Sequence, residues 1–126
     1  MHLNHFDHIV LTVRNLENTL LFYTGILGME ARKQNDRWAL FFGKQKINLH
    51  TEKSQFQPAA GEPTWGSQDI CFAVEEKIEM IAEEITNSGW PIELGPVRRI
   101  GALGPINSIY LRDPDGNLIE LASYDI

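Results

Sequence analysis

His8 and Asp69 are side chains that could bind a metal, and they hold the same position in two similar stretches of the sequence. Each opens a short apolar stretch typical of a strand, and each lies 20 residues before a glycine, Gly28 or Gly89. The two stretches are offset by 61 residues. Histidine and carboxylate side chains are common ligands of divalent metals. The repeat therefore predicts one supersecondary unit used twice, with a site built between its two copies.

The strand that begins at His8 is expected to have two unlike faces. Side chains alternate along a strand, so one face carries Ile9, Leu11 and Val13. This face is the more apolar of the two and should pack against a helix. His8 is then left on the opposite side of the sheet, where a ligand could reach it.

Both halves of the chain show the element order β-α-β-β-β, which predicts an α+β fold of two curved modules around a metal-binding cavity. The chain is expected to be a single domain, 1–126, with modules at about 5–52 and 67–126 and a linker at 53–66. Asn15 is expected to cap the first helix, and Gly28 and Gly89 to end the two helices. The segment 98–106, with two glycines and a proline, is predicted to be an inserted loop. The strands are expected at 8–13, 30–33, 37–42, 46–50, 69–74, 92–97, 107–112 and 117–123.

Composition narrows the possible functions. The net charge of −6 disfavours nucleic acid, because phosphate binding needs concentrated Lys and Arg. Cys71 is the only cysteine, which excludes an internal disulfide and fits a reducing compartment. Nothing in the sequence indicates a histidine or helix terminus that would activate it, so Cys71 is interpreted as a buried packing residue. The N-terminus lacks the pattern of a signal peptide, and no apolar run is long enough to span a membrane. These features predict a cytoplasmic protein.

Several motifs together resemble those of a known superfamily. They lie at 6–11, 22–23, 27–29, 47–50 and 113–121, and the last one reads Asp-Pro-Asp-Gly-Asn-Leu-Ile-Glu-Leu. In this combination the sequence resembles the vicinal oxygen chelate superfamily, which includes glyoxalase I, bleomycin- and fosfomycin-resistance proteins, methylmalonyl-CoA epimerase and extradiol dioxygenases. It looks most similar to small glyoxalase-like proteins, some of them described as bacterial virulence-associated.

The resemblance implies metal ligands on the first and last strands of each module. His8 matches the first-strand position, and Glu120 matches the last-strand position of the second module. Asn48 is the formal counterpart of Glu120, but His50 is two residues further on the same face and is the better transition-metal ligand, so His50 is chosen. Asp69 lies where many relatives have His; it could be a ligand, a base or a plain polar residue of the cavity.

The set His8, His50 and Glu120 would leave coordination positions open on one divalent ion (Ni, Zn, Mn, Co or Fe). The resemblance implies a metal-dependent, glyoxalase-like enzyme whose small substrate chelates through adjacent oxygens, with Glu120 or Asp69 moving a proton. Two alternatives stay open: an Fe(II) extradiol-type dioxygenase and a non-catalytic, antibiotic-binding protein. A homodimer is expected, in which one chain or two could supply the ligands.

Overall fold

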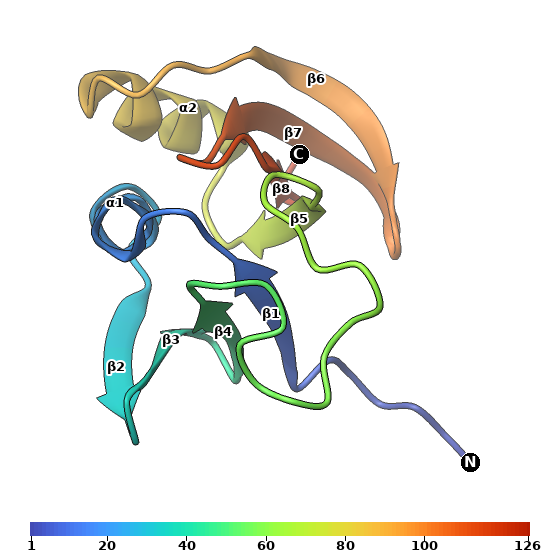
Figure 1. Ribbon diagram of the computed structural model, residues 1–126. Helices are drawn as coiled ribbons and strands as arrows, with labels where there is room; N and C mark the ends of the chain where they lie inside the picture. The colour runs from blue at the N-terminus through green and yellow to red at the C-terminus, as the bar shows by residue number, and fades with distance from the viewer. The chain divides into compact units, whose positions relative to one another are not determined.

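The computed structural model describes all 126 residues and divides into two compact units, Met1–Gly66 and Ser67–Ile126, named module 1 and module 2 below. Each module contains one four-stranded mixed sheet and one helical segment (Figure 1). The predicted α+β fold of two curved modules is therefore confirmed.

In module 1 the strand order is β1-β4-β3-β2, with β1 and β4 parallel and the other pairs antiparallel. Asn15 caps α1 as predicted, because its side-chain oxygen accepts a hydrogen bond from the Asn18 N–H at 2.8 Å. The helix continues as a π-helical segment, η1, and ends before Gly28. The elements are β1 (His8–Thr12), α1 (Leu16–Leu20), η1 (Leu21–Ile26), β2 (Glu30–Gln34), β3 (Arg37–Phe42) and β4 (Gln45–His50).

The sheet of module 1 has the two unlike faces that the sequence predicts. One face is apolar and buried, and it includes Leu11, Leu40 and Ile47, each no more than 1% exposed. His8 lies on the other face, because it alternates with Ile9 and Leu11 along β1. We call this second side of each sheet, opposite the buried apolar side, its open face.

Module 2 repeats this plan with the strand order β5-β8-β7-β6, in which β5 and β8 are parallel. Helix α2 packs against β6, β7 and β8 and buries Ile78, Ile81 and Ile85 on one side. Burial of each such side chain contributes about 1.5–3 kcal/mol. The elements are β5 (Asp69–Val74), α2 (Ile78–Asn87), β6 (Leu94–Gly101), β7 (Gly104–Arg112) and β8 (Leu118–Ser123).

The turn between β7 and β8 also fixes the start of β5. The Asp113 carboxylate accepts hydrogen bonds from the backbone N–H groups of Asp115 and Asn117, both at 2.9 Å, and from the Asn117 amide at 2.8 Å. The Asn117 side-chain oxygen accepts a further bond from the Gln68 N–H at 2.9 Å. Asp113 and Asn117 are buried, so they connect the turn to β5 from inside the module.

The prediction of an inserted loop at 98–106 is wrong. These residues form the closing end of the hairpin of β6 and β7, in which Arg99 pairs with Ile106 and Gly101 lies opposite Gly104. Gly104 has φ +125°, a conformation that L side chains rarely adopt, so a glycine is needed at this tight turn. The glycines and the proline thus mark the end of a hairpin rather than a loop (Figure 1).

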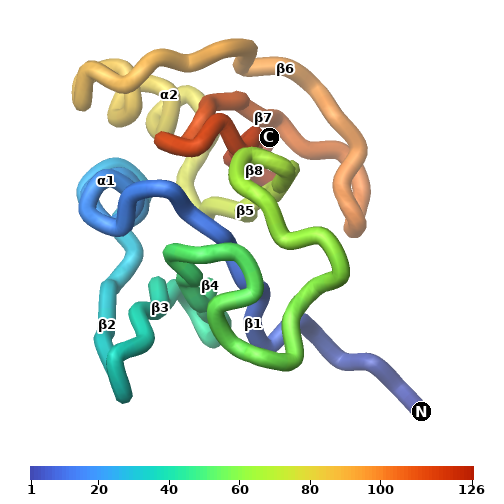
Figure 2. Tube along the Cα trace, viewed as in Figure 1, coloured from blue at the N-terminus to red at the C-terminus, as the bar shows by residue number.

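The connection between β4 and β5 contains no helix or strand and runs through residues 51–68 (green in Figure 2). Phe56 and Trp65 of this segment contact cationic side chains of module 1, Arg37 and Lys53 respectively. None of the helices is both long and apolar enough to cross a membrane.

Candidate functional site

The strand registers identify equivalent positions on the two open faces. Val10 of β1 pairs with Asn48 of β4, and Cys71 of β5 pairs with Glu120 of β8. Val10 and Cys71 are separated by the 61-residue offset of the repeat. Asn48 is therefore the structural counterpart of Glu120, just as His8 is the counterpart of Asp69.

His8 is positioned by its neighbour in sequence, Asp7. The His8 ring nitrogen Nδ1 lies 2.8 Å from Asp7 Oδ1, and this bond holds the pKa of Asp7 below its usual value. Such a carboxylate fixes the ring and its tautomer and leaves Nε2 as the free donor atom, the arrangement common for metal-binding histidines. The His8 side chain is 45% exposed, so Nε2 can be reached.

Glu120 is held from within module 2. The hydroxyl of Ser108, a fully buried residue on β7, donates a hydrogen bond of 2.6 Å to Glu120 Oε2. Oε1 has no such partner and can accept a proton or bind a cation. Glu120 lines a hollow of about 450 Å³ on the open face, together with Cys71, Arg99 and Tyr110.

Asp69 and Cys71 lie on the same face of β5 as Glu120 does on β8. Asp69 is exposed at the start of the strand. The interpretation of Cys71 as buried is wrong, since its side chain is exposed on the open face. Desolvation, followed by the charges of Glu120 and Asp69, raises the pKa of Cys71 to about 11. The thiol is therefore protonated near neutral pH and is a poor nucleophile.

His50 ends β4, opposite Thr12 of β1. In the register, His50 pairs with Thr12, four residues along β1 from His8, a separation of about 13 Å along the strands. Its ring contacts Phe56 edge-on, with 5.0 Å between centroids. Burial and then the nearby Arg37 lower the pKa of His50, so the imidazole is neutral near pH 7.

The sequence-predicted residues thus divide between the modules. His8 and His50 belong to module 1, while Asp69 and Glu120 belong to module 2. Within neither module do three or more His, Cys, Asp or Glu side chains gather as a possible metal cluster.

Some side chains of these open faces were missed in the sequence. They include the cations Arg37 and Lys46 of module 1 and Ser108 beneath Glu120. Alternation within β3 and β4 places both cations on the open face, so this signal was available. Ser108 could not be found in this way, because its contact depends on the pairing of β7 with β8.

Comparison with known proteins adds a family and a group of relatives. Residues 5–121 match the profile of the Glyoxalase/Bleomycin resistance protein/Dioxygenase superfamily. The chain is 50% identical to "Virulence protein STM3117" of Salmonella typhimurium over 126 residues, which cover 98% of this chain and 87% of that protein. It is 46% identical to "Glyoxalase domain-containing protein RDO1" of Mycosarcoma maydis, covering 94% of this chain and 67% of that protein.

Solved structures agree with these matches. The crystal structure of STM3117 superposes with a TM-score of 0.95 and 48% identity, covering 98% of this chain and 99% of that chain. Lactoylglutathione lyase from Agrobacterium tumefaciens superposes with a TM-score of 0.75 and 21% identity, covering 98% and 96% of the two chains, a likeness of fold alone.

Proposed function

Because the chain belongs to the Glyoxalase/Bleomycin resistance protein/Dioxygenase superfamily, we propose that it is a metal-dependent, glyoxalase-like enzyme. Its substrate is a small molecule that chelates through two adjacent oxygens. The observation that carries this proposal is that each module places two potential donors at equivalent positions, one on its first strand and one on its last strand. These donors are His8 and Asn48 in module 1, and Asp69 and Glu120 in module 2.

The donor chemistry of these residues suits a divalent metal ion. His8 offers a free Nε2 because Asp7 holds Nδ1, and Glu120 offers Oε1 because Ser108 holds Oε2. Both side chains are thereby fixed before any ion binds, which favours coordination. We propose His8 and Glu120 as ligands, with Asn48 and Asp69 as the remaining oxygen donors.

On β4 we propose Asn48 as the metal ligand in place of His50. Asn48 lies two residues closer to His8 along the strands than His50 does, and it is the counterpart of Glu120. His50 has the better ligand atom, but its ring is packed against Phe56. A divalent ion bound at these donors would supply Lewis acidity to the substrate oxygens.

The protein's own residues would orient the substrate and move its proton. The proton would be accepted at Glu120 Oε1 or at the Asp69 carboxylate, because the Ser108 hydroxyl bonds to Glu120 Oε2 and leaves these oxygens available. Removal of water from either carboxylate by a bound substrate would make that carboxylate a better base.

Metal analysis of the purified protein is the first test. His8→Ala and Glu120→Gln are expected to lose most of the bound metal. His5→Ala, which changes an exposed histidine bonded only to the neighbouring Phe6 carbonyl, is the control and should keep it. Asn48→Ala should weaken metal binding more than His50→Ala; the reverse result would restore His50 as the ligand.

Activity is tested next with each reconstituted metal. Hemithioacetals of methylglyoxal are the first substrates, with catechols under oxygen as the second set. Glu120→Gln should abolish turnover, because an amide has neither the charge nor the basicity of a carboxylate. Metal-free protein that still binds a small molecule tightly and turns over none of these would favour a binding protein over an enzyme.

A further inference from the structure

The open face of module 1 has a hollow whose floor is the small side chain of Ala39. In the strand register Ala39 lies between Asn48 of β4 and Arg32 of β2, and Arg37 is its neighbour on the same face of β3. The larger side chains around Ala39 leave a hollow of about 420 Å³. No carboxylate is among the residues that line it.

Two of the cations in this hollow form no ion pair within module 1. Arg32 is neutralised by Glu30 through two hydrogen bonds of 3.1 Å. Neither Arg37 nor Lys46 has a carboxylate of module 1 within ion-pair distance. Lys46 also borders a neighbouring hollow that contains Asp7, and its charge helps to lower the pKa of Asp7. The hollow around Ala39 therefore contains one uncompensated charge, Arg37, and one partly compensated charge, Lys46, above an uncharged floor.

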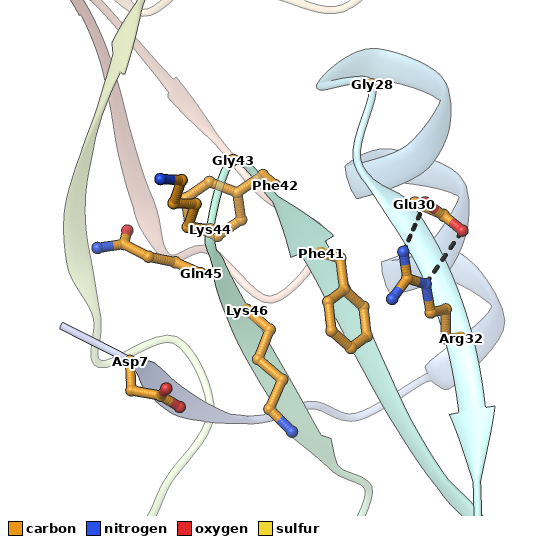
Figure 3. A pocket seen from close by; sticks show the side chains of 10 residues that line it. All are labelled: Asp7, Gly28, Glu30, Arg32, Phe41, Phe42, Gly43, Lys44, Gln45 and Lys46. Atoms are coloured by element: carbon orange, nitrogen blue, oxygen red, sulfur yellow. Dashed lines mark hydrogen bonds and ion pairs between the residues drawn. The ribbon is translucent and has the colours of Figure 1, made fainter.

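An aromatic ring lies beside each of these cations, in close contact with Arg37 and at the edge of the contact range for Lys46. The Arg37 guanidinium carbon lies 3.8 Å from the centroid of Phe56, and Lys46 Nζ lies 5.8 Å from that of Phe41. Figure 3 shows Lys46 and Phe41 next to one another on neighbouring strands. Stacking occupies one face of the planar guanidinium and leaves its N–H edge free to donate to an oxyanion. A cation fixed in this way loses little conformational entropy when a ligand binds.

We propose that this hollow binds the anionic group of a small organic acid or phosphate ester, with Arg37 and Lys46 as its cationic partners. As a substrate site the hollow rests on the proposed function, which it deepens by assigning the substrate a negative charge. Asn48 lines the same hollow, so a bound acid would lie beside a proposed metal donor. Phe56 and Phe41 would contact the apolar body of the molecule.

Calorimetric titration of the full chain with benzoate and with phenyl phosphate tests the proposal. Both probes have an aromatic body, and their relative affinities show whether a carboxylate or a phosphate is preferred. Arg37→Gln and Lys46→Gln are each expected to weaken binding by at least about tenfold. Trp38 also lines the hollow, so its fluorescence should change on binding in parallel with the heat.

Two further variants separate charge from shape. Lys33→Gln removes the same charge from the opposite side of β2, where Lys33 pairs with Asp36 at 3.7 Å, and it should bind both probes normally. Ala39→Leu keeps every charge but fills the floor of the hollow, and it should block binding. Circular dichroism of each variant checks that the fold is retained.

Three results would overturn the proposal. They are unchanged affinity in Arg37→Gln and Lys46→Gln, equal affinity for the neutral analogue benzamide, and loss of binding in the wild type when its metal is removed by a chelator. In the last case the metal itself holds the anion. If the protein holds no metal and yet binds benzoate or phenyl phosphate through Arg37, the hollow stands and the proposed enzyme function fails.

Discussion

The hydrogen bond between Ser108 and Glu120 determines which carboxylate oxygen is available. Ser108→Ala removes the 2.6 Å bond from a buried hydroxyl, and we expect the free energy of unfolding to fall by about 1–3 kcal/mol. Urea denaturation measures this loss. In a Glu120→Gln background the same substitution should cost less, because the charge that strengthens the bond is absent. Equal costs in both backgrounds would show that the loss does not come from this bond.

Cys71 combines an exposed side chain with a pKa raised to about 11. A raised thiol pKa means that less thiolate is present at any pH below it, so iodoacetamide at pH 8 should modify Cys71 on the order of tenfold more slowly than free cysteine. The rate should keep rising with pH to about 11, where free cysteine has already levelled off.

Glu120→Gln removes one of the charges that raise this pKa, so it should speed alkylation, whereas Asp125→Asn should not. Mass spectrometry of the modified chain measures both rates. Fast modification of the wild type at pH 8 would contradict the raised pKa.

At the scale of the elements, the close approach of Gly95 on β6 to β7 limits what can replace it. Its φ is +112°, and a Cβ there would meet the backbone of Ser108 and Ile109. Gly95→Ala is therefore expected to destabilise the protein by more than about 2 kcal/mol.

Gly25 provides the opposite case within η1. A Cβ at Gly25 meets nothing within 4 Å, so Gly25→Ala should stabilise the protein by about 0.5–1 kcal/mol. Thermal unfolding of the two variants compares them directly. A stabilising Gly95→Ala would show that the hairpin can shift to make room.

Much of this architecture could be predicted from local patterns. Alternation of polar and apolar residues gave β3 and β5 with their observed bounds, and cap chemistry gave the start of α1 at Asn15. The hairpin of β6 and β7 could not be predicted in the same way. Gly101, Gly104 and Pro105 are typical of loops, and only the pairing of Arg99 with Ile106 shows that the chain continues as strands around them.

Part of the candidate site could also be predicted from local patterns in the sequence. His8 and Glu120 follow from motifs, and the face of His8 follows from alternation along one strand. The hollow around Ala39 depends on which residues of three strands stand side by side, which no single strand specifies. The preference for Asn48 over His50 likewise appears only when β1 is placed next to β4.

At the scale of the whole molecule, charge is distributed unequally. Residues 67–126 contain 11 of the 17 acidic and 4 of the 11 basic residues, a net charge of −7, whereas residues 1–66 have a net charge of +1. Module 1 is thus the better place to bind an anion. Raising the ionic strength should weaken benzoate binding to the hollow of module 1, because an exposed cationic site is screened by salt.

A homodimer is the expected state in solution. The β6–β7 hairpin exposes Ile100 and Leu103, which are 79% and 87% exposed, and both sheets have open edges. Light scattering should give twice the chain mass of 14.3 kDa at micromolar concentration. Leu103→Glu should shift the protein toward monomer, while Met80→Glu, which places the same charge at a 61% exposed position on α2, should not. A monomeric wild type would contradict the prediction.

The position of β8 has a consequence for how the chain is made. β8 follows the other three strands of module 2 along the chain, yet it lies between β5 and β7 in the sheet. Until β8 has left the ribosome, the sheet of module 2 lacks an inner strand, whereas the sheet of module 1 is complete once β4 has emerged. Folding during synthesis therefore starts with module 1. Because Glu120 lies on β8, the proposed ligand and base takes its place in the sheet only after β5, β6 and β7 have been made.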